Sequence, residues 1–341
     1  MTTIATLFSG GEGVGVGAQA AGFRHLWGIE INDTIAQVAR DNGFYVVTAD
    51  VTQANPADFE RPDVLHASPP CPSFSCAKQG RQETGRDIAL AQATARFIEE
   101  LRPRFFTLEN VYMYRKSASW QIIASALDQL GYWYDLAHVN AADFGVPQTR
   151  KRMIVRATLG QMVPPLPPPG PWIGWYQAIE DLLPGLPDSK FANWQLKRMP
   201  VELRESLSVD SAGFPDADGV RVPVMRKADQ PINTIVANFE RRPMRAFLAT
   251  GQYGQPAGTP GRTCQTVSNE RPSPTVTAST KGDWRSAVHG RVVRMTPRCL
   301  ARFQAFPDEY KLPDSATLAT RVIGNAVPPL LYQKLISQLL K

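Results

Sequence analysis

The first half of the chain alternates short apolar runs with segments whose apolar residues recur at helical spacing. The clearest helical segments are Asp87–Leu101 and Trp120–Leu130. Strands and helices in strict alternation are typical of an α/β fold with a doubly wound, mostly parallel sheet, which is the fold we expect. The expected strands are Ile4–Phe8, His25–Ile29, Tyr45–Ala49, Val64–Ala67, Phe105–Leu108, Trp133–Val139 and Met153–Ala157.

A proline-rich stretch, residues 164–171, interrupts this alternation. Because proline continues neither a helix nor a central strand, the stretch predicts a stiff connector. Residues 172–290 hold many turn formers and short β-like runs, and we expect a smaller, irregular β-rich domain there. The predicted organisation is therefore a first domain over 1–160, a second over 172–290, and a C-terminal segment, 291–341, that returns to the first.

Composition excludes several classes of protein. Hydrophobic residues make up 43% of the chain and charged residues 20%, as in ordinary soluble proteins. No apolar run is long enough to cross a bilayer, and the first residues lack the pattern of a secretory signal, so we expect a cytoplasmic protein with no membrane partner. The four cysteines and four histidines show no metal-ligand spacing, so we expect neither a metal site nor a disulfide framework.

The net charge of +6 is compatible with a mildly basic enzyme that has no polyanionic partner. Basic residues nevertheless gather in two stretches, Arg150–Arg156 and Arg241–Arg245. Local clusters of this kind are the pattern expected of a protein that binds a phosphate backbone.

Glycines follow the first expected strand, in the segment Ser9–Gly17. Glycines between a strand and a helix let the backbone approach a ligand closely. Glu30 follows the second strand, where an acidic residue can bond ribose hydroxyls, and Asp50 ends the third, where it could contact an adenine amino group. These residues predict a nucleotide-bearing cofactor, but the pattern does not separate NAD from S-adenosylmethionine.

Reactive side chains follow later strands. Cys71 lies after the fourth expected strand, between prolines that stiffen its loop. A free thiol with a pKa near 8.5 is only about 3% thiolate at neutral pH, so cationic neighbours or helix dipoles would have to activate it. Glu109 follows the fifth strand, and Arg152 precedes the apolar run of the seventh. Each of the three, taken alone, is also compatible with a purely structural role.

In their order along the chain, these motifs resemble those of the DNA cytosine-C5 methyltransferase family over nearly the whole length. Six motifs in the family's order and at compatible spacing make the resemblance specific. It implies the sheet type of S-adenosylmethionine-dependent methyltransferases, and residues 172–290 match the place of the family's target-recognition domain. The motifs are Leu7–Gly10 (LFSG), Pro69–Cys71 (PPC), Glu109–Val111 (ENV), Gln148–Arg152 (QTRKR), Ala301–Asp308 (ARFQAFPD) and Ile323–Pro329 (IGNAVPP).

The resemblance implies methyl transfer from S-adenosylmethionine to C5 of cytosine in a specific duplex DNA sequence, with S-adenosylhomocysteine as the second product. The target base would be flipped out of the helix to reach the site. Cys71 would add to C6, because C5 becomes nucleophilic only in the resulting enamine. Glu109 would stabilise the charge that develops at N3, and Arg152 that at O2, while Arg150 would orient the loop or meet phosphate.

Further positions are carried over from the family. The segment Ser73–Arg86 resembles the loop that closes over the flipped nucleotide. Cofactor contacts are expected from Phe8, Gly10, Gly13, Glu30, Ile31, Asp50, Val51, Pro70, Asn325 and Val327. DNA contacts are expected from Ser73, Ser75, Lys78, Arg81, Arg86 and Gln148.

The chain also departs from the family's pattern. Thr6 stands where the family often has Asp, and Glu12 where it usually has Gly; both positions bear on how the methionine end of the cofactor is bound. Pro72, Phe303 and Ala305 also differ from the usual residues. None of these changes removes a group that the chemistry requires.

Three alternatives remain open on the sequence. Relatives that methylate tRNA make RNA the strongest rival substrate, although the long region 172–290 favours reading of duplex DNA in the major groove. A second alternative is a regulator that binds without catalysis, against which the intact Cys71, Glu109 and Arg152 argue. A third is a nicotinamide oxidoreductase, which gives no reason for the PPC and ENV motifs. We expect a monomer that acts on double-stranded DNA, alone or beside a separate cognate restriction endonuclease.

Overall fold

The computed structural model describes residues 1–70, 83–188, 247–249, 266–267, 272–273, 285–288 and 291–340. Its main sheet has seven strands in the order β3-β2-β1-β4-β5-β7-β6. Only β7 runs against its neighbours, so the predicted doubly wound, mostly parallel sheet is confirmed. The strands are β1 (Thr3–Leu7), β2 (Arg24–Glu30), β3 (Val46–Thr48), β4 (Val64–Ala67), β5 (Phe105–Asn110), β6 (Tyr132–Asn140) and β7 (Lys151–Leu159).

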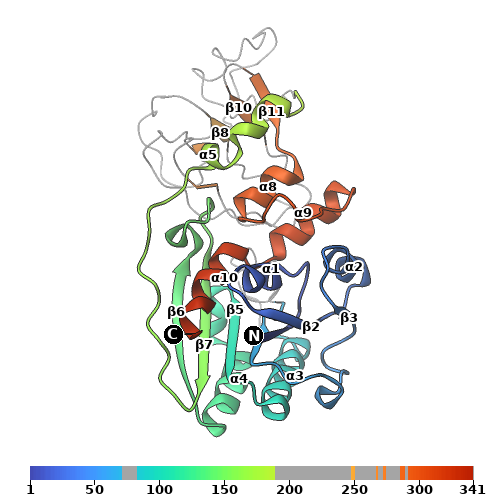
Figure 1. Cartoon of the computed structure of the whole chain (residues 1–341), viewed down its shortest axis with the longest axis vertical. Coiled ribbons are helices and arrows are strands. Elements are labelled where there is room, and N and C mark those ends of the chain that lie inside the picture. The colour runs from blue at the N-terminus through green and yellow to red at the C-terminus, as the bar shows by residue number, and fades with distance from the viewer. Residues whose placement is uncertain are drawn as a thin grey trace, which may run out of the picture.

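Helices cover both faces of this sheet (Figure 1). One face carries α1 (Gly13–Ala20) and α10 (Pro329–Ile336), which pack against each other although they come from opposite ends of the chain. The other face carries α3 (Gly85–Leu101) and α4 (Ala118–Gln129). The remaining elements of this part are α2 (Asp33–Asp41) and the 3-10 turns η1 (Pro56–Asp58), η2 (Tyr112–Lys116), η3 (Ala141–Phe144) and η5 (Ser337–Leu340).

The alternation of side chains along the central strands builds two cores. Ile4, Val64 and Phe105 are paired across β1, β4 and β5, and they pack with Tyr332 of α10 on one face. The next residue along each strand points to the opposite face. Leu65, which follows Val64 in β4, therefore packs in the core under α3 and α4. Strands buried on both faces explain why their sequences are nearly continuous apolar runs.

A row of polar residues crosses the α1/α10 face at one level of the sheet. The register pairs Thr6 with His66, His66 with Thr107, Thr107 with Arg156, and Arg156 with Asp135. His66 Nδ1 lies 2.8 Å from Thr107 Oγ1, and Arg156 forms an ion pair with Asp135. Because buried polar groups are costly without partners, these contacts lower the cost of the row, although His66 Nε2 and Arg156 Nη1 have no hydrogen-bond partner among the described residues.

The rest of the described chain forms the upper part in Figure 1. Its elements are α5 (Trp175–Ile179), η4 (Glu180–Gly185), β8 (Phe247–Ala249), β9 (Thr266–Val267), β10 (Arg285–Val288), β11 (Arg291–Arg294), α8 (Pro297–Phe303) and α9 (Ala316–Asn325). Trp175 and Ile179 share one core with Phe303 and Val322. The four short strands make a second sheet, β11-β10-β8-β9.

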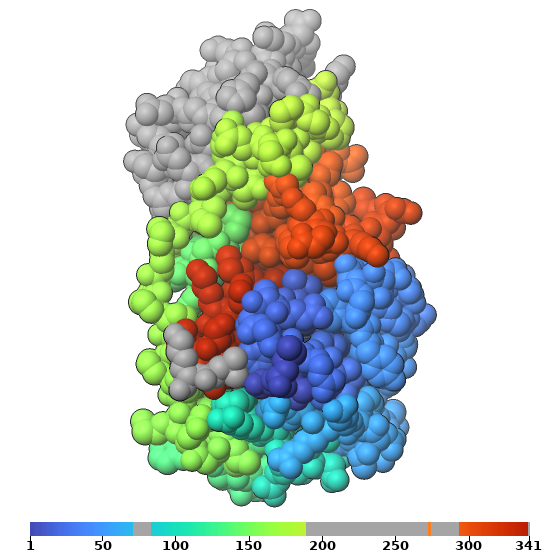
Figure 2. All heavy atoms as spheres, viewed as in Figure 1, coloured from blue at the N-terminus to red at the C-terminus, as the bar shows by residue number. Residues whose placement is uncertain are grey.

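The segment after β7 runs up one side of the molecule and joins the two parts (Figure 2). Strand β11 lies just past the predicted boundary at residue 290, yet it pairs with β10 in the small sheet. The exact domain boundaries therefore stay a prediction. No helix in the described ranges is long and apolar enough to traverse a lipid bilayer.

Candidate active site

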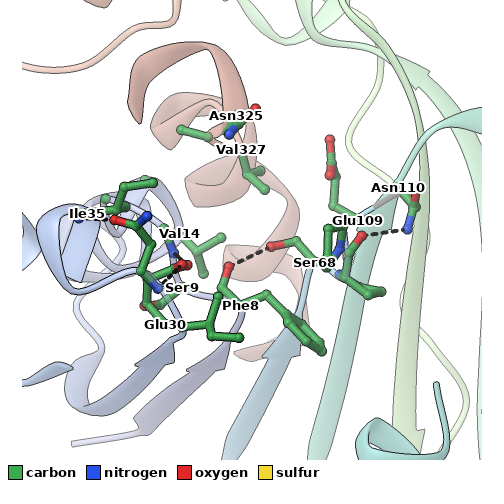
Figure 3. A pocket seen from close by; sticks show the side chains of 18 of the residues that line it. Phe8, Ser9, Val14, Glu30, Ile35, Ser68, Glu109, Asn110, Asn325 and Val327 are labelled. Atoms are coloured by element: carbon green, nitrogen blue, oxygen red, sulfur yellow. Dashed lines mark hydrogen bonds between the residues drawn. The ribbon is translucent and has the colours of Figure 1, made fainter. Parts of the chain in front are cut away.

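A cavity of about 890 Å³ opens at the carboxyl ends of β1, β2, β4 and β5 (Figure 3). This is the edge where open α/β sheets bind ligands, and the size suits a nucleotide-bearing molecule. All ten predicted cofactor positions line it. The same cavity is also lined by four charged residues, Arg86, Glu109, Arg150 and Arg152. The predicted cofactor positions and the predicted catalytic residues therefore share one cavity.

The backbone turn after β1 shapes one wall. Phe8 and Gly10 both adopt a left-handed conformation, with φ of 59° and 55°. Glu30, at the end of β2, holds this turn because its Oε2 accepts a hydrogen bond from Gly10 N at 3.0 Å. Its Oε1 accepts one from Asn32 N at 2.9 Å. Two backbone amides therefore fix the carboxylate at the cavity wall, where its remaining lone pairs suit ribose hydroxyls.

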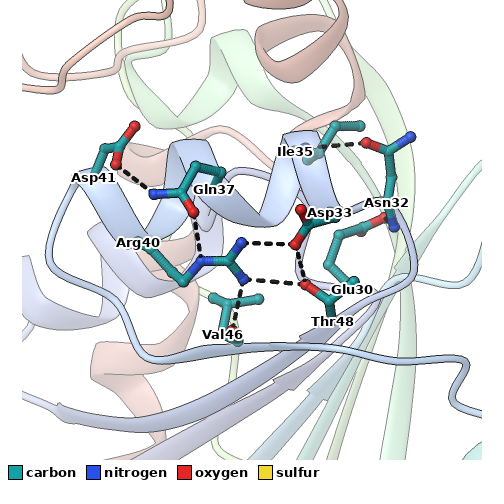
Figure 4. A network of polar contacts seen from close by, with 9 residues as sticks. All are labelled: Glu30, Asn32, Asp33, Ile35, Gln37, Arg40, Asp41, Val46 and Thr48. Carbon is teal, nitrogen blue, oxygen red and sulfur yellow. Dashed lines mark hydrogen bonds and ion pairs between the residues drawn. The ribbon is translucent and has the colours of Figure 1, made fainter.

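A polar network on α2 holds the corner beside Glu30 in place (Figure 4). Asn32 caps the helix, its side chain accepting from Ile35 N at 3.1 Å. Arg40 donates to Asp33 Oδ1 at 2.8 Å and to Val46 O and Thr48 Oγ1 at 3.1 Å. These bonds tie α2 to β3, so the ends of β2 and β3 keep a constant spacing on the cavity's edge.

Asp50 lies at the same edge and has defined partners. Its Oδ1 accepts from the backbone and the hydroxyl of Thr52, at 2.9 and 2.8 Å. Its Oδ2 accepts from Arg86 Nη2 at 2.9 Å. Burial alone would raise the pKa of Asp50, but the hydrogen bonds from Thr52 and Arg86 outweigh it and lower that pKa. Arg86 thus lines the cavity, and its predicted contact with DNA stays a prediction.

The residues at this end fit S-adenosylmethionine. Glu30 offers carboxylate oxygens at the ribose position, and Asp50 offers one near the expected adenine amino group. Within the described residues, the buried hydroxyl of Ser9 has no hydrogen-bond partner although the residue lines the cavity. An unsatisfied buried hydroxyl is rare and suits a polar ligand group. The sequence analysis assigned Ser9 no role. Its position in the glycine turn is the feature of the sequence that could have indicated a ligand contact.

Glu109 and the arginines form the other end. Glu109 is 7% exposed at the carboxyl end of β5. Arg152 Nε lies 2.8 Å from Glu109 Oε1, and Arg150 Nη2 lies 4.0 Å away. The Arg152 contact is close but not aligned as a hydrogen bond, so Oε1 has no hydrogen-bond donor among the described residues. Antiparallel β7 creates this cluster because it carries its first residues to the carboxyl end of β5.

Arg150 has a different environment from Arg152. It is 3% exposed, and its Nη1 donates to Gly324 O at 3.1 Å. Burial lowers the pKa of Arg150, the neighbouring charge of Arg152 lowers it further, and Glu109 raises it. The position connects the arginine motif to the end of α9, which favours the predicted orienting role over contact with phosphate.

The ENV motif also ties β5 to the PPC motif. Asn110 Nδ2 donates to Pro69 O at 3.1 Å, and its Oδ1 accepts from Val111 N at 2.8 Å. Pro70 lines the cavity immediately before Cys71. Cys71 itself lies outside the described residues, as do Ser73, Ser75, Lys78 and Arg81. Their predicted roles are carried forward as predictions.

Gln148 lies inside the protein rather than on its surface. It is fully buried, and its Nε2 approaches Phe303 O at 3.4 Å. The backbone around it bonds to the second part of the chain, with Thr149 N donating to Ser273 O at 2.8 Å and Ser273 N to Pro147 O. Its predicted contact with DNA stays a prediction. In the structure, Gln148 contacts Phe303, and its neighbours connect the arginine motif to Ser273.

The C-terminal segment completes the cavity. Asn325, the last residue of α9, and Val327, between α9 and α10, line it opposite the glycine turn (Figure 3). The hydroxyl of Tyr310, a residue that sequence reasoning did not select, donates to Gly11 O at 2.6 Å and so bonds this segment to the turn. No local sequence signal marks this contact, because the two residues are 299 positions apart.

The family model for C-5 cytosine-specific DNA methylases matches residues 2–341. The chain belongs to this family. Membership accounts for the cavity, since the family's motifs supply both its ends, and it makes the chain a DNA cytosine methyltransferase.

Named relatives agree with the assignment over nearly the whole chain. The Type II methyltransferase M1.HphI of Haemophilus parahaemolyticus is 27% identical over 365 residues, covering 99% of this chain and 87% of its own. The Type II methyltransferase M.NlaX of Neisseria lactamica is 28% identical and covers 96% and 92%.

Solved structures share the fold. A DNA modification methyltransferase encoded within an E. coli prophage superposes with a TM-score of 0.65 at 18% identity, covering 100% of this chain and 99% of the other. A Spodoptera frugiperda DNMT2 mutant gives a TM-score of 0.63 at 14% identity and covers both chains fully. At these identities the likeness supports the fold alone.

Proposed function

We propose that the chain methylates C5 of cytosine in a specific duplex DNA sequence, using S-adenosylmethionine, base flipping and a covalent bond between Cys71 and C6. The observation that carries the proposal is one cavity that holds both sets of groups. Glu109 and Arg152 lie at one end, the ten cofactor positions extend from the other, and Pro70 brings the chain to the wall just before Cys71.

Bound S-adenosylmethionine supplies an electrophilic methyl group. Cys71, as the thiolate, adds to C6 of the flipped cytosine, and the electron pair of the C5–C6 bond moves toward N3 and O2. Glu109, in its protonated form, donates a hydrogen bond from its carboxyl group to N3, which accepts it; Oε1 has no hydrogen-bond partner among the described residues. Arg152 holds a fixed positive charge beside that carboxyl group and stabilises O2.

The remaining steps restore the enzyme. C5 takes the methyl group, loses its proton to a base, and the electron pair of that C–H bond reforms the C5–C6 double bond. The C6–S bond breaks, and the thiolate of Cys71 is released. The two ion-pair partners of Glu109, Arg150 and Arg152, are cations and cannot accept a proton, so water is the base that we propose for the C5 proton.

Sequence-specific duplex DNA is supported as the substrate by the relatives, which are named Type II methyltransferases. Residues 172–290 are the proposed reader of the target sequence. The backbone bonds between Ser273 and the segment Pro147–Thr149 connect that region to the arginine motif. A separate cognate restriction endonuclease is the proposed functional partner.

The direct test uses purified protein with radiolabelled S-adenosylmethionine and either duplex DNA or tRNA. Label should enter DNA and not tRNA, and bisulfite sequencing of DNA from expressing cells should give one modified cytosine in one recurring sequence. Label in tRNA alone, or none in either substrate, would contradict the proposal.

The covalent step has its own test. Cys71→Ala should abolish methyl transfer and keep binding of S-adenosylhomocysteine. DNA with 5-fluorocytosine at the target should trap a protein–DNA adduct that survives denaturing electrophoresis, because fluorine does not leave as a proton does. Turnover by Cys71→Ala near the parent rate would refute the assignment.

A further inference from the structure

A fully buried carboxylate lies directly beneath the cofactor turn. Glu12 is the last residue before α1, and neither it nor Thr6 has any exposed surface. Glu12 does not line the cavity, although Gly10, Gly11 and Gly13 on either side of it do. A buried carboxylate without partners would be strongly unfavourable, so its contacts define what it does.

Each carboxylate oxygen of Glu12 has hydrogen-bonding partners. Oε1 accepts from the hydroxyl of Thr6 on β1 and lies 3.0 Å from His25 Nε2 on β2. Oε2 accepts from Gly15 N at 3.2 Å, which caps the first turn of α1. One side chain therefore joins two strands and a helix to the turn that passes over it.

The surroundings are shaped for this carboxylate. A Cβ at Gly28 would lie 2.3 Å from Glu12 Oε1, and a Cβ at Gly15 would lie 2.6 Å from Oε2. Glu12 itself has φ 60°, a left-handed conformation that glycine adopts freely and other residues adopt at a cost. Glu12 keeps this conformation at a cost in free energy, and the hydrogen bonds of its side chain to Thr6 and Gly15 offset that cost.

We propose that Glu12 is a positioning residue for the cofactor, and that Thr6 and Glu12 are a compensating pair. The two positions are those where the sequence departs from the family's usual Asp and Gly, and they are in direct contact. A carboxylate on residue 6 would occupy the space that the Glu12 carboxylate now fills, and a glycine at 12 would remove the φ strain. The inference rests on the proposed binding of S-adenosylmethionine.

The pair predicts a specific pattern of affinities for S-adenosylhomocysteine, measured by calorimetry on the full chain. Glu12→Gln and Glu12→Gly should each weaken binding roughly tenfold or more, because charge-assisted bonds to the turn are lost. Thr6→Asp alone should also weaken it, because two carboxylates then meet in a buried space. The double variant Thr6→Asp/Glu12→Gly should recover affinity to within about threefold of the parent, a strong non-additivity expected of residues in contact.

A second readout separates positioning from general stability. Glu12→Gln should raise the KM for S-adenosylmethionine while kcat at saturation stays within about threefold, and the rise in KM should persist at temperatures well below the Tm of the variant, where it is fully folded. Glu60→Gln, an exposed carboxylate that pairs with Arg24, is the matched control and should change neither affinity nor KM. If Glu12→Gly fails to fold, Glu12→Gln and the double variant still decide the question.

Two results would overturn the proposal. One is parent-like affinity in Glu12→Gln, and the other is a folded double variant that binds no better than the weakest single variant. A parent protein that binds no S-adenosylhomocysteine would instead refute the proposed function, so the two failures are distinguishable.

Discussion

Arg86 Nη2 donates a hydrogen bond to Asp50 Oδ2 at 2.9 Å, which joins the first turn of α3 to the cavity edge at the end of β3. Both side chains line the cavity. The contact connects the cavity edge proposed to hold adenine to the helix that begins at the end of Ser73–Arg86, the segment predicted to close over DNA. It also leaves Asp50 ionised, since its pKa is lowered.

Asp50→Asn should weaken binding of S-adenosylhomocysteine roughly tenfold, because the amide can no longer offer carboxylate oxygens to both Arg86 and an adenine amino group. The Thr52 bonds to Oδ1 can persist, so thermal stability should change little. Calorimetric titration measures the effect, and Asp58→Asn, an exposed carboxylate on η1, serves as control. Equal affinities of Asp50→Asn and the parent would exclude an adenine contact from this residue.

Arg152→Lys should lower kcat for methyl transfer by roughly 100-fold, because a lysine ammonium does not reproduce the planar group that contacts Glu109. Affinity for S-adenosylhomocysteine should stay within about twofold, since the change lies at the base end of the cavity. Single-turnover rates with saturating DNA measure the first quantity. Lys151→Ala, the exposed neighbour, should keep kcat within about twofold; an equal loss there would point to general disruption of β7.

His66 should make the protein less stable in mild acid. Burial lowers the pKa of His66 to about 3, from the ordinary value of 6.5. The unfolded chain therefore gains a proton as the pH falls through 6.5, while folded His66 remains neutral until near pH 3. The stability linked to neutral His66 is complete above pH 6.5 and declines as the pH falls from 6.5 toward 3.

Between pH 7.5 and pH 5 this group should remove roughly 2 kcal/mol from the free energy of unfolding. Urea denaturation of the parent and of His66→Asn at both pH values tests it. The variant should be less stable at pH 7.5, because it loses the hydrogen bond to Thr107, and should show a shallower pH dependence. His138 is an exposed histidine whose pKa burial and the charges of Lys151 and Arg115 also lower, so His138→Asn should flatten the slope, but less than His66→Asn does. A parent-like slope in His66→Asn would contradict the linkage.

Gly17→Ala should separate α1 from α10. The added Cβ would lie 2.3 Å from the backbone oxygen of Pro329, which cannot move without shifting the helix. Overpacking of this kind costs about 1–3 kcal/mol, and the displacement would also disturb Val327 at the cavity. The Tm measured by thermal denaturation should fall, and so should the affinity for S-adenosylhomocysteine. Gly85→Ala, with open space around its Cβ, is the control and should be neutral.

Much of the fold was predictable because its signals are local. Apolar runs and helical spacing predicted β1 to β7 and helices α3 and α4 to within two residues at their ends. The order of motifs predicted which residues would gather, since parallel strands bring their carboxyl ends to one edge of a sheet. Glu30, Asp50 and Glu109, distant in sequence, line one cavity for that reason.

Other features depend on partners that no local pattern identifies. The antiparallel insertion of β7 between β5 and β6 brings Arg152 to Glu109, and strand spacing does not encode it. Gln148 is buried against Phe303 because a segment over 150 residues away packs there. The same holds for Tyr310 at Gly11.

The sequence by itself determined the fold class, the family and the groups that the chemistry needs, because residue types at ordered spacings carry that information. Only the tertiary structure decided that Thr6 and Glu12, which look like two separate departures, share one buried contact. It also decided that Arg86 bonds Asp50 at the cavity edge. Contacts between side chains depend on the packing of several elements at once, and that packing exists only in the folded chain.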